Sequence, residues 1–238
     1  MTTAETNELK VIAGGSIAAL LKELAPQFEK ASGYKLSIHF DSTPNIITRM
    51  TSGTPFDAIV VPSDVFRDGG AKALLATSPV ADIALVGYGV IVRAGTPKPD
   101  ISTPSVLKRG LLDAKSVAFL PASAAGSYIT RVFEQLGIAE EMKAKTRVQA
   151  TPAQIAPAVA RGEAELGLFL TNVLIAPGVE FAGPLPPPLQ QQLTFTAAIA
   201  ADTKEADTAR AFVDFLMTPS AVAAIKAAGM APGTRQTY

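Results

Sequence analysis

The sequence has 238 residues, of which 48% are hydrophobic and 18% charged, and its 21 Lys and Arg balance 21 Asp and Glu. This composition is typical of a globular protein with one large or two small domains and excludes disorder as a main feature. A neutral chain without basic runs offers no electrostatic basis for nucleic-acid binding. With no Cys and a single His, disulfides, Cys-ligated metals and His-cluster metal sites are excluded. We therefore expect no nucleic-acid partner, no metal and no cofactor.

The sequence leaves two cellular locations possible. Charge or proline interrupts every apolar run well before the ~18 residues that a membrane helix needs, so we expect no membrane insertion. The first residues contain no basic region followed by an apolar core, which is the pattern of a secretory signal. The sequence predicts a cytoplasmic protein if the chain is complete and a periplasmic one if a signal peptide has been removed.

Strands alternate with helices in the amino-terminal part. A strand over residues 9–13 runs into Gly14 and Gly15, and apolar residues then recur at helical spacing up to Gly33. The next predicted elements are a strand over 35–40, a helix over 45–52, a strand over 57–61 and a capped helix start at 62–64. This alternation predicts a parallel sheet with helices on both faces.

A long apolar run over residues 83–92 follows, broken by Gly87 and Gly89. We interpret it as a strand that crosses between domains, with the two glycines as hinge positions. A second series then contains strands over 117–120, 147–149 and 166–170 and helices over 127–136 and around 155–159. A stiff polyproline-like connector over 183–188 leads to a returning strand over 193–201. Two closing helices, over 206–216 and 219–228, are expected to pack on the first domain.

The predicted fold class is α/β with two lobes, each a mixed, mostly parallel sheet flanked by helices. The first lobe comprises residues 1–84 and 198–238, and the second comprises residues 89–193. Two strand crossovers, at 85–88 and 194–197, form the hinge.

Four strand-to-helix junctions carry small residues with hydroxyl groups. They are Gly14-Gly15-Ser16, Ser42-Thr43-Pro44-Asn45, Ser123-Ala124-Ala125-Gly126-Ser127 and Ala150-Thr151-Pro152. Such junctions lie at the carboxyl ends of strands, where ligands bind in open α/β sheets, and helix N-termini there offer N–H groups to anions. Ser and Thr are also the usual helix caps, so one junction alone indicates no more than a turn. The four together predict a site for a small anion.

Several longer segments extend this pattern over most of the chain. They are Val11-Ile12-Ala13-Gly14-Gly15-Ser16, Phe40-Asp41-Ser42-Thr43, Ser52-Gly53-Thr54-Pro55-Phe56-Asp57-Ala58, Ala125-Gly126-Ser127-Tyr128, Val159-Ala160-Arg161-Gly162-Glu163-Ala164-Glu165-Leu166-Gly167 and Phe215-Leu216-Met217-Thr218-Pro219-Ser220. From Leu9 to Gly229 the sequence resembles the type II periplasmic binding proteins of the molybdate-binding (ModA-like) group. The resemblance implies that group's two-lobed fold, a monomer that closes on a small anionic ligand and, if the protein is exported, the permease of an ABC transporter as partner.

In that family, hydroxyls and backbone N–H groups at these junctions hold an oxyanion, which implies ligand roles for Ser16, Thr43 and the Ala125 amide. Two family positions differ here. Pro152 stands where an N–H donor is expected and has none, and Leu170 replaces a tyrosine. These differences argue against molybdate itself and in favour of a different ligand. The predicted ligand-binding residues are Gly15, Ser16, Ser42, Thr43, Asn45, Ser123, Ala125, Ser127, Thr151, Thr171 and Asn172.

Two functions fit such a site. The first is binding of a small oxyanion or organic carboxylate without chemistry. The alternative is an isomerase, because the molybdate-binding group is similar to aconitate isomerase, which moves a double bond in a tricarboxylate by proton abstraction and return. A third hypothesis, a ligand-sensing domain in the cytoplasm, would need a partner protein because no DNA-binding segment is present.

The isomerase alternative requires a general acid or base near the junctions. The catalytic candidates are Asp41 and His39, with Asp64 and Tyr128 near other junctions. Asp41 could instead cap a helix. His39 could instead be an exposed strand residue without a role in catalysis. The sequence leaves two roles open for Arg49, Arg93 and Arg131. Each could pair with a ligand carboxylate, or each could simply be solvated.

Overall fold

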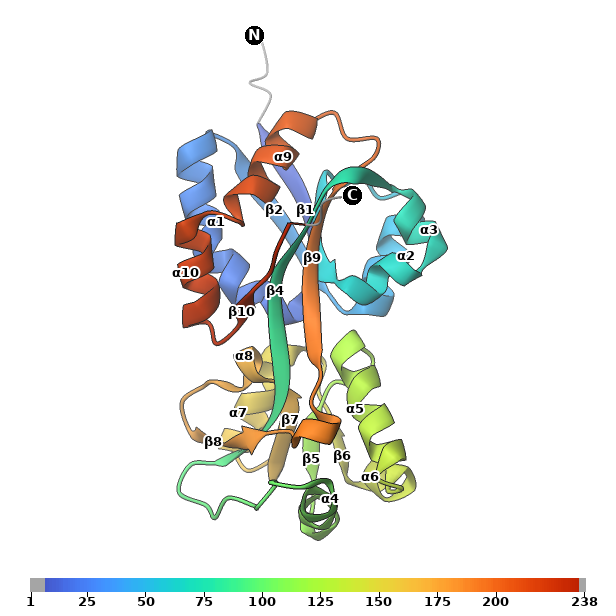
Figure 1. The fold of residues 1–238 in the computed structure, drawn as a ribbon, viewed down its shortest axis with the longest axis vertical. Helices are drawn as coiled ribbons and strands as arrows, with labels where there is room; N and C mark the ends of the chain where they lie inside the picture. The colour runs from blue at the N-terminus through green and yellow to red at the C-terminus, as the bar shows by residue number, and fades with distance from the viewer. Residues whose placement is uncertain (1–6, 236–238) are drawn as a thin grey trace. The chain divides into compact units, whose positions relative to one another are not determined.

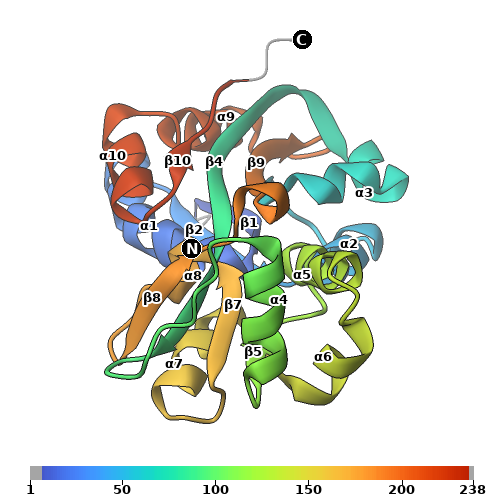
Figure 2. The same cartoon turned by 60° about the horizontal axis from the view of Figure 1, so that its bottom comes forward.

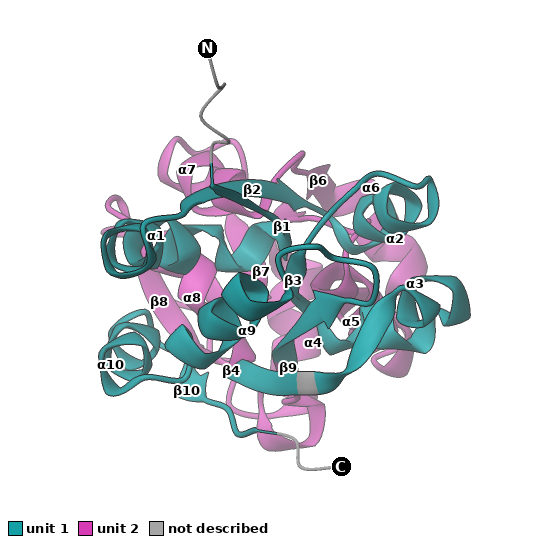
Figure 3. Ribbon diagram, turned by 90° about the horizontal axis from the view of Figure 1, so that it is seen from above, with its two compact units in different colours: residues 1–85, 194–238 teal, residues 86–193 magenta. Residues whose placement is uncertain are grey.

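The structure is a computed structural model that describes residues 7–235, apart from the side chain of Pro79. Residues 1–6 and 236–238, which the sequence analysis places in the first lobe, lie outside the described residues. The chain forms two compact units: unit 1 comprises residues 1–85 and 194–238, and unit 2 comprises residues 86–193 (Figure 1, Figure 3). The chain passes from one unit to the other within β4 (Leu75–Arg93) and again within β9 (Gln192–Ala200).

The remaining elements include those of the predicted alternation and several further helices and strands. The other strands are β1 (Glu8–Gly14), β2 (Lys35–Asp41), β3 (Ala58–Pro62), β5 (Val117–Phe119), β6 (Thr146–Val148), β7 (Leu166–Leu170), β8 (Val179–Pro184) and β10 (Ala231–Pro232). The α-helices are α1 (Ala18–Ser32), α2 (Thr43–Thr51), α3 (Gly69–Ala73), α4 (Pro104–Asp113), α5 (Ala124–Gln135), α6 (Ala139–Lys145), α7 (Ile155–Ala160), α8 (Thr171–Leu174), α9 (Ala206–Phe215) and α10 (Pro219–Ala227). Short 3₁₀ helices are η1 (Gly15–Ile17), η2 (Ser63–Arg67), η3 (Pro152–Gln154) and η4 (Pro187–Leu189). No helix in residues 7–235 is both long enough and apolar enough to cross a bilayer.

Unit 1 contains a mixed sheet with the strand order β2-β1-β3-β9-β4, and β10 also pairs with β4. The sequential strands β1, β2 and β3 are parallel, whereas β9 runs antiparallel to β3. Helices cover both faces, with α1 and α10 on one side and α2 and α3 on the other (Figure 1). On the first side Phe28 packs against Phe212 and Phe215, and on the second Ile46 and Met50 pack against Ile12.

Unit 2 contains a second mixed sheet, in which β7 lies between β4 and β5, and β6 follows β5. The β5 strand is parallel to both β6 and β7, and Figure 2 shows β5 and β7 side by side. The β4 strand runs antiparallel to β7 and also pairs with β8. Helix α5 packs near β7 and α6, and α7 packs on β5, β7 and β8. Mixed sheets flanked by helices confirm the predicted fold class.

Two predicted helices begin earlier than expected. The helix expected from residue 45 begins at Thr43, and the one expected from residue 127 begins at Ala124. The reason is that the serine just before each start takes the N-cap position. In the second case the Ser123 hydroxyl accepts the Gly126 N–H at 2.9 Å, which satisfies a donor of the first turn.

Other expectations were wrong or incomplete. The segment 183–188 is not a polyproline connector, because Gly183 and Pro184 end the edge strand β8, where a missing N–H breaks no sheet hydrogen bond. The crossing strand is longer than expected: β4 begins at Leu75, and β10 pairs with it at residues 84 and 85. The segment after β3 forms η2, a short 3₁₀ helix. The elements α3, α4, α6, α8, β8 and β10 were not expected from the sequence.

Candidate functional site

The strands of unit 1 end together at one edge of the sheet. In the parallel pairing of β1 with β2, Gly14 lies opposite Asp41, so Ser16 and Ser42 both follow directly from neighbouring strand ends. A Cβ on Gly14 would lie 3.1 Å from a side-chain carbon of Pro62, the last residue of β3. The lack of a side chain at Gly14 therefore lets the ends of β1 and β3 approach closely and positions the turn that carries Ser16.

Asp41 is the last residue of β2 and lies two residues before the start of α2. Its Oδ1 accepts the Ser42 N–H and the Asn45 side-chain amide, each at 2.7 Å, and its Oδ2 lies 3.4 Å from His39 Nε2. Asp41 is not the N-cap of α2, which is Ser42, but its carboxylate lies near the positive end of the helix, where a negative charge is favourable. Two predicted ligand donors, the Ser42 N–H and the Asn45 amide, are thus directed to Asp41 in this structure. Thr43 is the first residue of α2.

Unit 2 presents a corresponding edge. Because β5 is parallel to β6 and β7, the carboxyl ends of all three strands lie at one edge. The segments that follow these strands contain every ligand-binding residue predicted in the second lobe: Ser123, Ala125 and Ser127 after β5, Thr151 after β6, and Thr171 and Asn172 after β7. The sheet thus brings together residues that are up to 49 positions apart in the sequence.

The start of α5 is tightly held. The buried Ser123 hydroxyl accepts the Gly126 N–H and donates to the Leu120 carbonyl, both at 2.9 Å. A Cβ on Gly126 would lie 1.9 Å from the same Leu120 oxygen, so the helix can approach the end of β5 only with glycine at this position. The contacts fix the first turn of a 12-residue helix, including the amide of Ala125, at the edge of the sheet.

A capping box organises the turn after β6, which the sequence analysis missed. The Gln154 side-chain oxygen accepts the N–H groups of Ala150 and Thr151 at 3.1 and 3.3 Å. The spacing Thr151-x-x-Gln154 is a known signal for this arrangement. The side-chain oxygen of the exposed Thr151 in turn accepts the Gln154 N–H, so both side chains of the capping box hold this turn.

Neither of the two positions that differ from the molybdate-binding pattern presents a polar group. Pro152 begins η3 and is buried, and Leu170, the last residue of β7, is fully buried. The adjacent Thr171 and Asn172 are half-buried in the first turn of α8. The polar side chains that directly follow β7 are those of Thr171 and Asn172.

Two of the remaining acid–base candidates are engaged elsewhere. Asp64 forms an ion pair with Arg67 at 2.9 Å. Tyr128 is buried, its hydroxyl donates to the Leu189 carbonyl at 2.7 Å, and its ring packs against Tyr88. Burial raises the pKa of the Tyr128 hydroxyl, with Arg131 acting in the opposite direction. Arg131 lies beside this ring, with its guanidinium carbon 5.5 Å from the centroid of the Tyr128 ring.

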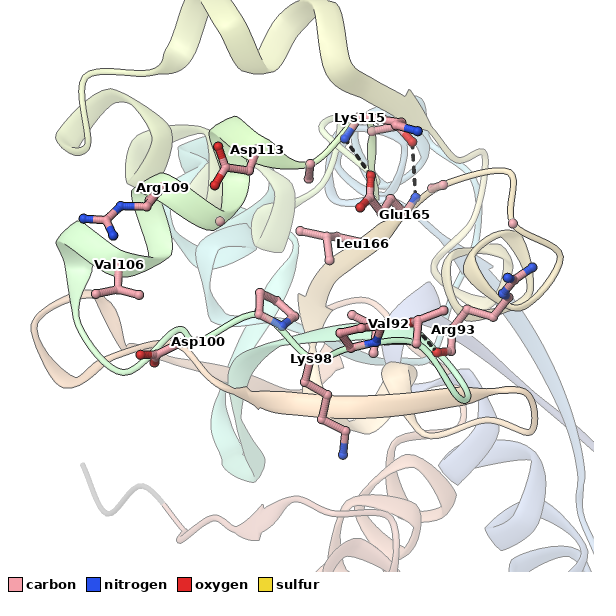
Figure 4. A pocket seen from close by; sticks show the side chains of 18 residues that line it. Val92, Arg93, Lys98, Asp100, Val106, Arg109, Asp113, Lys115, Glu165 and Leu166 are labelled. Atoms are coloured by element: carbon pink, nitrogen blue, oxygen red, sulfur yellow. Dashed lines mark hydrogen bonds between the residues drawn. The ribbon is translucent and has the colours of Figure 1, made fainter.

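A pocket of about 920 Å³ lies in unit 2 at the other edge of the sheet, beside the amino ends of β5 and β7 (Figure 4). Its charged lining contains four basic residues, Arg93, Lys98, Arg109 and Lys115, and three acidic residues, Asp100, Asp113 and Glu165. Lys98 pairs with Glu180 at 3.2 Å, and Glu165 accepts the Lys115 N–H at 2.7 Å. None of the predicted ligand-binding residues lines this pocket. We therefore place the candidate site at the carboxyl edges, where the predicted ligand-binding residues lie.

Comparison with known proteins decides the family. Residues 9–231 match the family model described as bacterial extracellular solute-binding protein. The chain belongs to this solute-binding protein family. The match covers both units, and it explains why hydroxyls and helix starts gather at the carboxyl edge of each sheet, where α/β proteins bind ligands.

Three relatives illustrate the similarity of this solute-binding protein to known proteins. An aconitate isomerase from Pseudomonas sp is 32% identical over 232 residues, covering 94% of this chain and 87% of the relative. The molybdate-binding protein ModA of Azotobacter vinelandii is 28% identical over 229 residues, covering 95% and 90%. The solved periplasmic molybdate-binding protein of Azotobacter vinelandii superposes with a TM-score of 0.76 at 22% identity, covering 93% and 98%. An extracellular family favours the exported alternative over the cytoplasmic one.

Proposed function

We propose that this solute-binding protein binds a small oxyanion or organic carboxylate through the hydroxyls and helix-start N–H groups at the carboxyl edges of its two sheets. The observation that supports the proposal is the parallel pairing of β1 with β2 and of β5 with β6 and β7, because the segments that follow these strands contain all the predicted ligand-binding residues. Neutral donors and helix N-termini stabilise an anion without a counter-charge.

The proposed ligand class includes polycarboxylates. Two relatives point to different anions, because one is an aconitate isomerase and the other a molybdate-binding protein. The loss of an N–H donor at Pro152 and of a hydroxyl at Leu170 disfavours molybdate relative to a carboxylate. Thr171 and Asn172 offer polar groups beside Leu170 that suit carboxylate oxygens.

The extracellular solute-binding family supports a proposal for the partner and the cellular location. We propose that the protein acts as a monomer in the periplasm and delivers its ligand to the permease of an ABC transporter. Fractionation of the native host, followed by detection of the protein in the periplasmic fraction, tests the address.

A thermal-shift screen tests the binding function. The ligands are molybdate, tungstate, sulfate, phosphate, citrate, cis-aconitate and trans-aconitate. A ligand at 100 times its Kd stabilises the folded state by about 2.7 kcal/mol, which raises the Tm of a protein of this size by roughly 5–10 °C. We expect the largest shift with a carboxylate, and the absence of a shift with every anion contradicts the proposal.

A pair of threonines on α2 supplies the matched variants. Thr43 begins the helix at the sheet edge, whereas Thr48 is exposed one turn later and its hydroxyl donates to the Pro44 carbonyl at 3.0 Å. We expect Thr43→Ala to weaken binding at least about 10-fold, as loss of a hydrogen bond to a charged ligand does, and Thr48→Ala to leave the Kd unchanged. Equal effects of the two substitutions would show that the hydroxyl at the edge has no ligand role.

A further inference from the structure

The pocket of unit 2 is a site that the proposed function does not use. Its volume of about 920 Å³ is within the range of small-molecule sites, and all its lining residues lie between positions 92 and 166, inside one unit (Figure 4). It lies beside the amino ends of β5 and β7, whereas the predicted ligand-binding residues of this unit follow the carboxyl ends of the same strands and of β6. A ligand in this pocket would therefore be separate from an anion at the carboxyl edge.

The floor of the pocket is apolar. Val92 of β4 and Leu166 of β7 are directly paired across the two strands, so their side chains lie on the same face of the sheet, and both are buried. Pro97, Pro99 and Val106 also line the pocket and are half-buried or exposed, so they present apolar surface to water. A ligand with an apolar body gains by covering this surface.

Three cationic side chains of the lining have no partner among the residues that the structure describes. They are Arg93 at the end of β4, Arg109 on α4 and Lys115 just before β5. Figure 4 shows Arg93 and Arg109 on opposite sides of the pocket, and a Cβ on Gly162 would lie 3.5 Å from Nη1 of Arg93. An unpaired guanidinium is suited to a carboxylate or phosphate, which it binds through two parallel hydrogen bonds.

Most of the lining carboxylates are engaged by the protein. Asp100 accepts the Ser102 N–H at 2.9 Å, and Glu165 accepts the Lys115 N–H at 2.7 Å. The fourth lining cation is paired with a glutamate of β8 at 3.2 Å. Within residues 7–235, Asp113 is the one lining carboxylate without a partner. Three unpaired cations therefore stand against one unpaired carboxylate, which favours an anionic ligand.

A buried hydroxyl adds a neutral donor to this lining. Ser116 is only 7% exposed and lines the pocket. Its oxygen accepts the Glu165 N–H at 3.2 Å, and its proton has no acceptor in the described part of the chain. A buried hydroxyl that keeps a free donor is suited to an oxygen of an anion.

Gly110 leaves space in the wall that α4 provides. It lies inside this ten-residue helix, where glycine is less favourable than alanine. A Cβ here would lie 3.5 Å from Pro99, an ordinary contact, so packing does not require glycine at this position. The missing side chain instead keeps this side of the pocket open.

We infer that this pocket binds a small organic anion with an apolar body, such as an aromatic phosphate or carboxylate. The anionic group pairs with Arg93, and the apolar body lies on Val92 and Leu166. The inference goes beyond the proposed function, because it assigns the protein a second ligand class at a second place and does not depend on anion binding at the carboxyl edges.

An NMR titration of isotope-labelled protein tests the site and the ligand class together. The probes are naphthyl phosphate, inorganic phosphate and naphthol, which present the whole ligand, its anionic group and its apolar body. We expect naphthyl phosphate to shift the amide resonances of residues 92–100, 106–116 and 162–166 and to bind there at least about 10-fold more tightly than either fragment. Equal affinity for one of the fragments, or shifts confined to the carboxyl edges, overturns the inference.

Three variants test the roles of charge and space. Arg93→Gln should weaken naphthyl phosphate binding about 10-fold, as loss of a charged hydrogen bond does, and leave the affinity for naphthol unchanged. Arg147→Gln is the matched control, since Arg147 is exposed in the same unit and does not line the pocket. Gly110→Leu should abolish binding by filling the pocket, and it should keep the wild-type Tm because leucine is a good helix former.

Equal effects of Arg93→Gln and Arg147→Gln overturn the inference, as does wild-type affinity of Gly110→Leu. Arg93→Gln removes no side-chain contact within the described residues, so the test remains valid even if Gly110→Leu fails to fold.

Thr43→Ala separates this inference from the proposed function. It should leave naphthyl phosphate binding in the pocket unchanged while weakening the binding of the anion found by the thermal-shift screen, and Arg93→Gln should do the reverse. Lack of naphthyl phosphate binding in the pocket overturns the inference alone. Lack of a thermal shift with every anion of the screen overturns the proposed function alone.

Discussion

Gly126 illustrates how a single residue positions the candidate site. An added Cβ at this position would lie 1.9 Å from the Leu120 carbonyl oxygen and 2.6 Å from that of Pro121. Both atoms belong to the backbone, so a side chain can be accommodated only if the start of α5 moves away from the end of β5. The position of the Ala125 amide therefore depends on a neighbour that offers no chemistry of its own.

We expect Gly126→Ala to destabilise the folded state by about 3 kcal/mol, the upper end of the usual overpacking cost, and to weaken anion binding. Urea denaturation and calorimetric titration measure the two effects. Gly69→Ala is the control, because no atom lies within 4 Å of the added Cβ and the residue begins a helix. It should change the stability by no more than about 0.5 kcal/mol. A Gly126→Ala protein with wild-type stability would show that the helix start moves freely.

Tyr128 gives a prediction on pH. Burial raises the pKa of its hydroxyl, so the folded state holds this proton more firmly than the unfolded chain does. The stability that results is fully present below the ordinary tyrosine pKa of 10.0 and is lost as the pH rises through the higher folded-state pKa.

Tyr128→Phe should therefore reduce the loss of stability between neutral pH and pH values above 10.0. At neutral pH it should cost about 1 kcal/mol, because the Leu189 carbonyl loses its donor. Urea midpoints at the two pH values measure both effects. Tyr34→Phe is the control, since the Tyr34 hydroxyl is half-buried and donates to Glu205. If Tyr34→Phe flattens the pH dependence equally, burial of Tyr128 is not its cause.

At the scale of the elements, the carboxyl ends of parallel strands define the site. In unit 2 three strands end at one edge, and each is followed by a helix or 3₁₀ helix that starts there. The capping residues of these starts serve two purposes in the proposed function: they satisfy backbone N–H groups, and they place the rest of the first turn toward a ligand.

Substitutions at two N-cap residues of unit 2 test the stabilising role and the ligand-binding role separately. Ser123 caps α5 at the carboxyl edge, and Thr103 caps α4 elsewhere by accepting the Val106 N–H at 3.3 Å. We expect Ser123→Ala and Thr103→Ala each to cost about 1 kcal/mol of stability. Ser123→Ala alone should also raise the Kd for the anion. Thermal unfolding and calorimetry provide the measurements, and equal Kd values for the two variants would contradict the role of the α5 start.

The elements found from sequence and those missed differ in the kind of signal they carry. Helices α1, α9 and α10 show regular apolar spacing and were predicted to within a few residues. The start of α4 carries a Thr103-Pro104 capping signal that was overlooked. The β8 strand carries no such signal, since Gly183 and Pro184 suggest a turn and only the pairing with β4 makes the segment a strand.

At the scale of the whole molecule, two chain crossings connect the units, one in β4 and one in β9. Near the first crossing, the Gln190 side chain accepts the Tyr88 N–H and donates to the Tyr88 carbonyl, both at 2.9 Å. Gly87 leaves room for this side chain, because an added Cβ would lie 3.3 Å from its oxygen.

The resemblance to two-lobed binding proteins predicts that ligand binding closes the lobes, with backbone adjustment at Gly87 and Gly89. Small-angle scattering of the wild-type protein should show a smaller radius of gyration with the anion that gives the largest thermal shift. The Thr43→Ala variant, at a ligand concentration that saturates only the wild type, should show no change. A radius of gyration that stays constant at full occupancy would contradict closure.

The sequence by itself determined the alternation of strands and helices, the glycine and hydroxyl residues at the junctions, and the lack of the N–H donor at Pro152. These features depend on residues close together in the chain, and local hydrogen bonding and apolar spacing encode them. The tertiary structure decided which strands are neighbours, that the Gln190 side chain pairs with the Tyr88 backbone, and that the Tyr128 hydroxyl donates to the Leu189 carbonyl. It also decided that Tyr128 is buried against Tyr88. Strand pairing and side-chain burial join residues far apart in sequence, and no local pattern specifies the partner.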